Sequence, residues 1–125
     1  MGNVYGRYGG KSLHKYSHGE SFMTLFEHRF SEGIYLLDEP EAALSPTRQL
    51  AFLARLDELV KAKKAQFIIA THSPILLSYP GATIYKFDEH GINKISYEDT
   101  EHFQVTKDFL NGYEGFYKHL QAPSD

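Results

Sequence analysis

The sequence contains no cysteine among its 125 residues. Disulfide bonds and thiolate metal sites are therefore excluded, and such a chain fits a reducing compartment. No stretch approaches the roughly 20 apolar residues that a helix needs to cross a bilayer. Residues 1–12 are rich in glycine and tyrosine and lack the apolar run of a signal peptide. We expect a cytoplasmic protein with no direct membrane insertion.

An excess of positive charge is also missing. The chain has 13 Lys and Arg residues against 16 Asp and Glu residues, for a formal net charge of −3. This balance argues against a module held on nucleic acid by a basic face, although it leaves nucleic-acid binding undecided. The cluster of Lys61, Lys63 and Lys64 is better explained as a solvated helix end.

Apolar residues make up 42% of the chain, which is enough to build a core. Their helical spacing predicts a helix over residues 20–30. Two short apolar runs, residues 34–37 and 66–70, predict buried strands. A second predicted helix, opened by Ser45 as N-cap and Pro46 at the first helical position, joins them and runs to about residue 63. Strand, helix and strand in this order predict a parallel pair in an α/β fold.

The C-terminal third has a different pattern. Residues 83–87 and 92–97 predict a hairpin that turns around residues 89–91. A helix is expected over residues 101–110, followed by a break at Asn111–Gly112 and then by a short aromatic helix.

Asp38 and Glu39 come directly after the first predicted strand. Open α/β sheets bind ligands at the carboxyl ends of their strands. Adjacent carboxylates point in different directions, so one can hold Mg²⁺ while the next faces an attacking water. An ordinary exit from the strand explains the same residues equally well, because Asp and Pro both favour turns.

His72 follows the second predicted strand. If the two strands are neighbours, His72 faces the same crevice as Glu39, where a neutral imidazole could hydrogen-bond a γ-phosphate or its attacking water. A histidine after a strand is more often a simple loop residue. The functional interpretation therefore depends on its position relative to Asp38 and Glu39.

Residues 17–21, Ser-His-Gly-Glu-Ser, stand at the start of the first predicted helix. Ser17 and Glu20 have the spacing of a capping box, which is a purely structural explanation. A capping box needs no glycine, however, and Gly19 costs helix stability by roughly 1 kcal/mol. An anion that approaches the backbone closely would explain it.

These segments occur in the order and at the spacing of four motifs of the ABC-type ATPases. Residues 17–21 resemble the signature motif, and residues 34–39 (IYLLDE) resemble the Walker B strand with its catalytic glutamate. Residues 42–45 (AALS) stand where the D-loop follows, and His72 is similar to the switch histidine. The resemblance implies a P-loop NTPase-type three-layer fold, here partial, with a parallel sheet core and a C-terminal hairpin plus helix.

The same resemblance implies ATP and Mg²⁺ as cofactors and gives each candidate residue a role. Asp38 would bind Mg²⁺, Glu39 would polarise the attacking water and His72 would sense the γ-phosphate. The signature residues act across a dimer in this family, so they would complete the nucleotide site of a partner; they are Ser17, Gly19 and Glu20.

Within the superfamily, transporter ATPases usually read Asp-Glu-Pro-Thr at this place, with Asp at the end of the D-loop and His-Asp at the switch. This chain has Glu41, Ser45 and Ser73 at those positions. It therefore resembles the soluble branch of predicted AAA-type ATPases, related to overcoming-lysogenization-defect nucleases and chromosome-maintenance ATPases. Ser45 departs from the D-loop pattern, which places the usual contact across the dimer in doubt.

The phosphate-binding loop, Gly-x-x-x-x-Gly-Lys-Ser/Thr, is missing. The nearest match, residues 6–12, puts its first glycine one residue too close and lacks a preceding strand and a following long helix. We therefore interpret residues 1–125 as a single C-terminal portion of an ABC-type ATPase domain. The chain is expected to be inactive alone and to form a homo-oligomer or a complex with a partner that bears the Walker A loop.

Two other functions remain open. One is the ATP-binding subunit of an ABC transporter, which requires a membrane partner. The other is a non-catalytic fragment that docks on a full-length ATPase. A zinc site is not expected, because His14 and His18 precede the predicted helix and no carboxylate or third histidine shares a convincing spacing.

Overall fold

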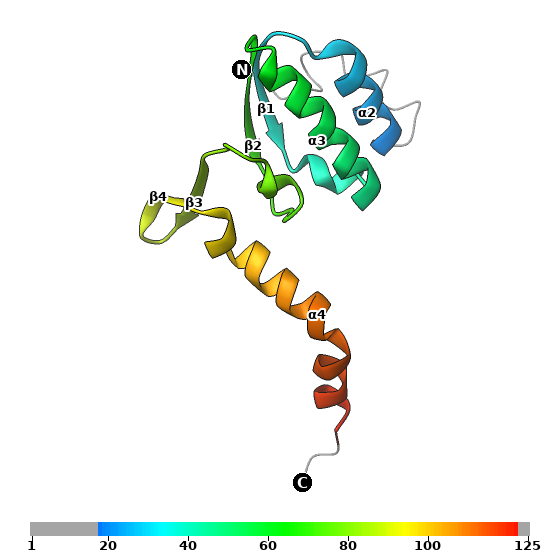
Figure 1. Cartoon of the computed structure of the whole chain (residues 1–125), viewed down its shortest axis with the longest axis vertical. Helices are drawn as coiled ribbons and strands as arrows, with labels where there is room; N and C mark the ends of the chain where they lie inside the picture. Colours follow the sequence, from blue (N-terminus) through cyan, green and yellow to red (C-terminus); the bar gives the residue numbers. More distant parts are fainter. Residues whose placement is uncertain (1–17, 123–125) are drawn as a thin grey trace. The chain divides into compact units, whose positions relative to one another are not determined.

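The computed structural model describes residues 18–122, and for residues 18–21 it describes the backbone alone. The chain divides into two compact units, with the boundary between Tyr79 and Pro80. In the described residues, the first unit has a parallel strand pair with two α-helices, and the second has a hairpin and a long helix (Figure 1).

The first unit is built around two neighbouring strands. Its elements are helix α2 (His18–Arg29), strand β1 (Gly33–Asp38), the 3₁₀ turn η2 (Pro40–Ala43), helix α3 (Pro46–Lys61), strand β2 (Ala65–Ala70) and the 3₁₀ turn η3 (Leu76–Ser78). β1 and β2 pair in parallel, from Gly33 opposite Ala65 to Asp38 opposite Ala70. The predicted strand–helix–strand unit is therefore confirmed.

Helix α3 begins as the sequence predicts. The Ser45 hydroxyl accepts a hydrogen bond from the Arg48 backbone N–H at 3.2 Å, and Pro46 occupies the first helical position. The cap supplies an acceptor to an N–H group that the helix itself cannot satisfy. The helix ends at Lys61 rather than at residue 63, because Lys63 adopts a positive φ of 59° that helical backbone does not allow.

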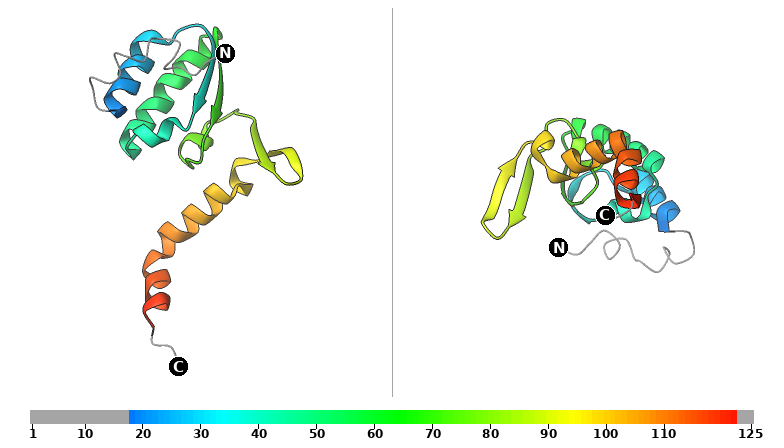
Figure 2. Two further views of the ribbon diagram at one scale, coloured as in Figure 1. Left: turned by 180° about the vertical axis from the view of Figure 1, so that it is seen from behind. Right: turned by 90° about the horizontal axis from the view of Figure 1, so that it is seen from below.

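Aromatic rings form the centre of the first unit. Phe22 and Phe26 on α2 and Phe30, directly after the helix, are spaced four apart and are at most 1% exposed. The Phe26 ring lies 4.4 Å from that of Phe52 on α3 and 6.0 Å from that of Phe67 on β2. Both helices therefore pack on the same face of the sheet, and Figure 2 shows α2 and α3 side by side over it.

Among the described residues of this unit, no helix or strand forms a layer over the opposite face of the β1–β2 pair. Ile34 on β1 is 45% exposed and Ile68 on β2 is 54% exposed, whereas Tyr35 and Leu37, which point to the other face of β1, are buried. Burial of both strands on both faces, which their apolar runs predict, is not found among the described residues of this unit, which form two layers. The mixed α/β arrangement with a small parallel sheet is consistent with the expected fold in partial form. A continuous apolar run shows that both faces can be covered, but it does not show what covers them.

The second unit begins with the predicted hairpin. Strands β3 (Ile84–Asp88) and β4 (Gly91–Ile95) pair antiparallel, with Asp88 opposite Gly91. The Asp88 carboxylate accepts a hydrogen bond from the His90 backbone N–H at 2.8 Å, as in an Asx turn. Gly91 has a φ of 107°, a conformation that side-chain-bearing residues rarely adopt.

A 3₁₀ turn, η4 (Tyr97–Asp99), leads into helix α4 (Glu101–Gln121). The Thr100 hydroxyl caps α4 by accepting from the Phe103 backbone N–H at 3.1 Å. The predicted break is present, because Gly112 has non-helical angles (φ −141°, ψ 25°) and helix continues on either side.

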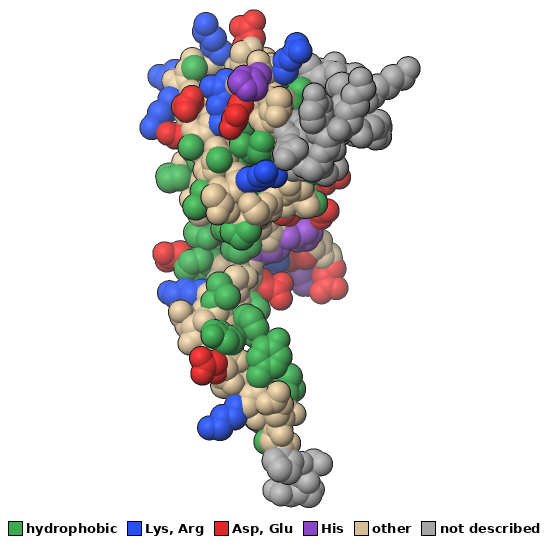
Figure 3. Space-filling view, turned by 90° about the vertical axis from the view of Figure 1, so that its right-hand side faces the viewer, with side chains coloured by type: hydrophobic (Ala, Val, Ile, Leu, Met, Phe, Trp, Pro, Cys, Tyr) green, Lys and Arg blue, Asp and Glu red, His purple; other side chains and the backbone are tan. Residues whose placement is uncertain are grey.

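Apolar side chains are exposed along α4, and Figure 3 shows hydrophobic side chains on its surface. The larger ones are Val105, Phe109, Leu110, Tyr113, Phe116, Tyr117 and Leu120. Within residues 18–122, no helix combines the length and the apolar character needed to cross a membrane.

Candidate functional site

The candidate site lies at the carboxyl ends of the two parallel strands. Asp38 is the last residue of β1 and stands opposite Ala70, the last residue of β2. The Glu39 backbone N–H donates to the Ala70 carbonyl at 2.7 Å, which extends the pairing by one residue. The loops that follow the two strands therefore begin side by side. Asp38 and Glu39 stand at the start of one loop, and His72 lies in the other.

Glu39 has an unusual backbone conformation. Its angles, φ 48° and ψ 54°, lie in the left-handed region. For a residue with a side chain this conformation costs about 1–2 kcal/mol and is frequent at functional sites. The chain reverses there and enters the turn η2, closed by a 3.0 Å hydrogen bond from the Ala42 backbone N–H to the Glu39 carbonyl.

The side chains of Glu39 and His72 meet across the two loops. Glu39 Oε1 lies 3.5 Å from His72 Nε2, a distance that allows an ion pair when the imidazole is protonated. Both side chains are exposed, His72 at 75% and Glu39 at 52%, so the pair can also contact a ligand from solvent. An exposed pair of this kind contributes about 0–1 kcal/mol to stability, too little to hold the two loops together.

Glu41 provides the stronger connection between the loops. Its Oε1 accepts a hydrogen bond from the Thr71 hydroxyl at 2.6 Å, and its Oε2 accepts one from the His72 backbone N–H at 2.9 Å. In the sequence, Glu41 stands out only as a departure from the transporter pattern. An acidic residue three positions past a strand gives no indication of its partners, which depend on the strand register and on the turn at Glu39.

Ser73 fixes the same loop to α3. Its hydroxyl donates to Gln49 Oε1 at 2.5 Å and accepts from the backbone N–H groups of Ile75 and Leu76, both at 3.1 Å. Ser73 is 6% exposed, so water cannot easily replace these partners.

Residues 71–79 are tied to α3 a second time at their far end. The Tyr79 hydroxyl donates to Asp57 Oδ1 at 2.8 Å, and Asp57 Oδ2 lies 2.7 Å from Lys61 Nζ. The hydrogen bond from Lys61, followed by that from Tyr79, lowers the pKa of Asp57. Burial, followed by the hydrogen bond to Asp57, raises the pKa of Tyr79. Residues 71–79 are therefore anchored near both ends, which restricts the position of the His72 backbone.

Replacing Ser73 with alanine should destabilise this loop. The change leaves the backbone N–H groups of Ile75 and Leu76 and the side-chain oxygen of Gln49 without their partner in a buried or partly buried place. We expect the free energy of unfolding to fall by about 1–3 kcal/mol, measured by urea denaturation. Ser78→Ala is the matched control, because the exposed Ser78 hydroxyl donates a single bond to the Ile75 carbonyl. Equal losses in the two variants would contradict the role of Ser73.

The signature-like residues lie at or before the start of the described part of the chain. Ser17 and residues 6–12, the nearest match to a phosphate loop, lie outside the described residues. Gly19 and Glu20 fall in the first turn of α2, where the backbone alone is described. Their proposed action on a partner's nucleotide stays a prediction.

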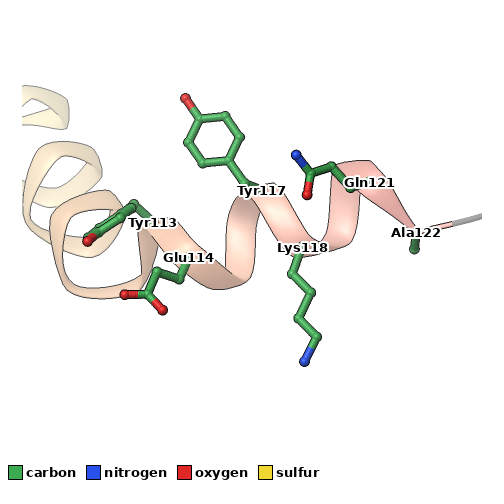
Figure 4. Close-up of a pocket in the computed structure, with 6 residues that line it drawn as sticks. All are labelled: Tyr113, Glu114, Tyr117, Lys118, Gln121 and Ala122. Atoms are coloured by element: carbon green, nitrogen blue, oxygen red, sulfur yellow. The ribbon is translucent and has the colours of Figure 1, made fainter.

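A shallow hollow on α4 offers no comparable chemistry. It is lined by residues of the end of α4 and the residue after it, and Figure 4 shows Tyr117 and Lys118 pointing to opposite sides of the helix. The lining residues are Tyr113, Glu114, Tyr117, Lys118, Gln121 and Ala122. Side chains that diverge from a single helix do not enclose a ligand, so the ends of β1 and β2 remain the candidate site.

The acidic pair suits Mg²⁺ in the form that nucleotide enzymes use. Mg²⁺ is usually held by one or two carboxylates together with substrate phosphates and water, not by a complete cage of protein ligands. Asp38 and Glu39 supply carboxylate oxygens at an exposed strand end. Among the described residues, no group of three or more His, Asp or Glu side chains is arranged to hold a metal by itself. The donor set therefore fits Mg²⁺ bound together with a nucleotide.

Comparison with known proteins points to the same region. Residues 19–77 match a family model described as "AAA ATPase domain". This range includes β1, the turn η2, α3, β2 and the His72 loop, so residues 19–77 form a region similar to AAA-type ATPases. Such a region indicates nucleotide binding at a coarse level, and the family implies a nucleotide that is typically bound with Mg²⁺.

A curated relative shares part of the sequence. "Protein ea59" of Escherichia phage lambda is 46% identical over 46 residues. The match covers 37% of this chain and 9% of that protein. The chain thus spans less than a tenth of the relative's length.

Proposed function

We propose that this chain is the ATP-binding and ATP-hydrolysing module of a soluble ABC-type ATPase. The observation that carries the proposal is the contact between Glu39 and His72, side chains from the ends of two adjacent parallel strands, beside Asp38. The match of residues 19–77 to an AAA ATPase domain supports a nucleotide as the ligand. The order of the sequence motifs supports the ABC-type class.

Each of the three side chains has a role in this proposal. Asp38 would hold Mg²⁺, which when bound neutralises charge on the phosphates. Glu39 accepts a hydrogen bond from the attacking water and directs it toward the γ-phosphate. His72, 3.5 Å from Glu39, contacts the γ-phosphate or the same water from the other strand. Ser17, Gly19 and Glu20 act on a nucleotide bound to a partner subunit.

The proposed module needs a phosphate-binding loop from elsewhere. Among the described residues, the ends of β1 and β2 supply carboxylates and an imidazole, but no Gly-rich loop with a lysine. Among the described residues, β1 and β2 are the two strands of their sheet, so each has one edge at which a further strand can pair. We propose that a second polypeptide or another segment carrying a Walker A loop pairs there. It brings the lysine and amide groups that bind the β- and γ-phosphates.

The 125-residue chain alone should therefore hydrolyse ATP negligibly. Without the lysine and the amide cradle, the phosphates lose their main electrostatic partners. Phosphate release measured with Mg²⁺ and ATP should stay below about 0.01 s⁻¹, against about 1–100 s⁻¹ for ordinary phosphoryl-transfer enzymes. Turnover of about 1 s⁻¹ that disappears in Glu39→Gln would show that the chain is complete without a second segment. Recovery of the chain with membranes would favour a transporter subunit instead.

A further inference from the structure

We propose that Glu41 is a positioning residue, whose carboxylate sets the place of His72 relative to Glu39. The catalytic meaning of this inference rests on the proposed ATPase function, but its structural content does not. The carboxylate of Glu41 reaches from the β1 loop to the β2 loop and accepts two hydrogen bonds from consecutive residues, Thr71 and His72.

The backbone around Glu39 brings Glu41 to this place. The left-handed turn at Glu39 reverses the chain, and buried Pro40 starts the short 3₁₀ turn η2. Glu41 thereby lies beside the end of β2 instead of continuing along β1. A residue 30 positions away in the sequence becomes its hydrogen-bond partner.

The two bonds hold the base of the His72 side chain. One fixes the backbone N–H of His72 itself, at 2.9 Å, and the other fixes the Thr71 hydroxyl, at 2.6 Å. That hydroxyl also accepts from the Ser73 backbone N–H at 3.0 Å, and the Ser73 side chain is bound to Gln49. Glu41 is thus one end of a hydrogen-bonded series that runs through the loop to α3.

The direct contact between His72 and Glu39 is too weak to fix the position of the His72 loop. Both side chains are exposed, and their 3.5 Å separation is longer than either bond made by Glu41. Hydrogen bonds to a charged acceptor are stronger than neutral ones and restrict geometry more tightly. The Glu39–His72 distance therefore follows from the loop position that Glu41 fixes.

Amide hydrogen exchange of the 125-residue chain, followed by NMR, tests the structural content. In Glu41→Ala, the His72 amide should exchange about tenfold faster or more, because it loses its acceptor. Glu41→Gln keeps one acceptor oxygen for two donors and should show a smaller increase. The amides of β1 and β2 should change less than about twofold, which separates local release from general destabilisation.

Glu32→Ala is the matched control, since Glu32 is an exposed acidic residue of the same unit without a described side-chain hydrogen bond to the loop. It should leave the exchange of the His72 amide unchanged. Unchanged exchange in Glu41→Ala, or an equal rise in β1 and β2, would overturn the proposal.

A second measurement tests the catalytic meaning in a polypeptide that joins this chain to a phosphate-binding loop. Glu41→Ala should lower kcat about tenfold, corrected for the folded fraction, with the KM for ATP changed less than about twofold. Glu41→Gln should recover part of the loss. A rise in KM as large as the fall in kcat would contradict a positioning role for Glu41 in catalysis. So would a kcat equal to that of the parent polypeptide. If the parent polypeptide itself showed no turnover, the proposed ATPase function would fail, while hydrogen exchange would still decide whether Glu41 fixes the loop.

Discussion

Replacing Glu39 with glutamine should lower ATP turnover at least about 100-fold in a polypeptide that joins this chain to a phosphate-binding loop. Glutamine keeps the size of the side chain and the left-handed backbone, but it removes the charged acceptor that orients the attacking water. Nucleotide binding should change less than about threefold, because the groups that bind the phosphates are elsewhere. Phosphate release and equilibrium binding of ATP measure the two effects separately.

Glu32→Gln makes the same chemical change at an exposed position just before β1, away from the carboxyl ends of the strands. Its turnover should match that of the parent polypeptide. A Glu39→Gln variant with turnover within fivefold of the parent would show that another group orients the water. A variant that lost binding and turnover together would instead assign Glu39 to holding the nucleotide or its Mg²⁺.

Removing the Phe26 ring should destabilise the first unit severely. Phe26 is fully buried and its ring contacts those of Phe22, Phe30, Phe52 and Phe67. Phe26→Ala should lower the free energy of unfolding by about 3–5 kcal/mol, because both apolar burial and the packing of neighbouring rings are lost. Urea denaturation followed by circular dichroism provides the measurement.

Leu50→Ala is the comparison, since Leu50 lies on α3 but is 59% exposed. Its cost should stay within about 0.5 kcal/mol. Similar costs for the two substitutions would mean that the aromatic cluster is not the centre of the fold. A domain of this size is stabilised by about 5–15 kcal/mol in total, so the Phe26 substitution removes a large part of the stability.

The local conformation of the candidate site carries a cost that the surrounding contacts offset. A left-handed glutamate is unfavourable, yet it is held by the pairing of its N–H with Ala70 and by the turn closed from Ala42. Strain of this kind is stable where neighbouring structure determines it. Here it directs Glu39 toward His72 and Glu41 toward Thr71 at once.

Sequence patterns were sufficient for the local elements and for the neighbourhood of the site. The Ser45–Pro46 helix start, the two parallel strands, the hairpin that turns at residues 89–91 and the interruption at Gly112 each depend on residues close together in the chain. The same holds for the expectation that His72 faces Glu39. The residues that follow two neighbouring parallel strands must lie at the same end of the sheet.

The tertiary structure alone decided how the site is held and which face of the sheet is covered. Glu41 meets Thr71, and Gln49 meets Ser73, across separations of 30 and 24 residues. Such partners follow from the strand register and from the left-handed turn at Glu39. No pattern in the sequence predicts either of these features. Likewise, the apolar runs of β1 and β2 are compatible with one covered face or two. A hydrophobic side chain favours burial, but its identity does not indicate which element of the fold covers it. The packing of α2 and α3 against one face settles that question for the described part of the first unit.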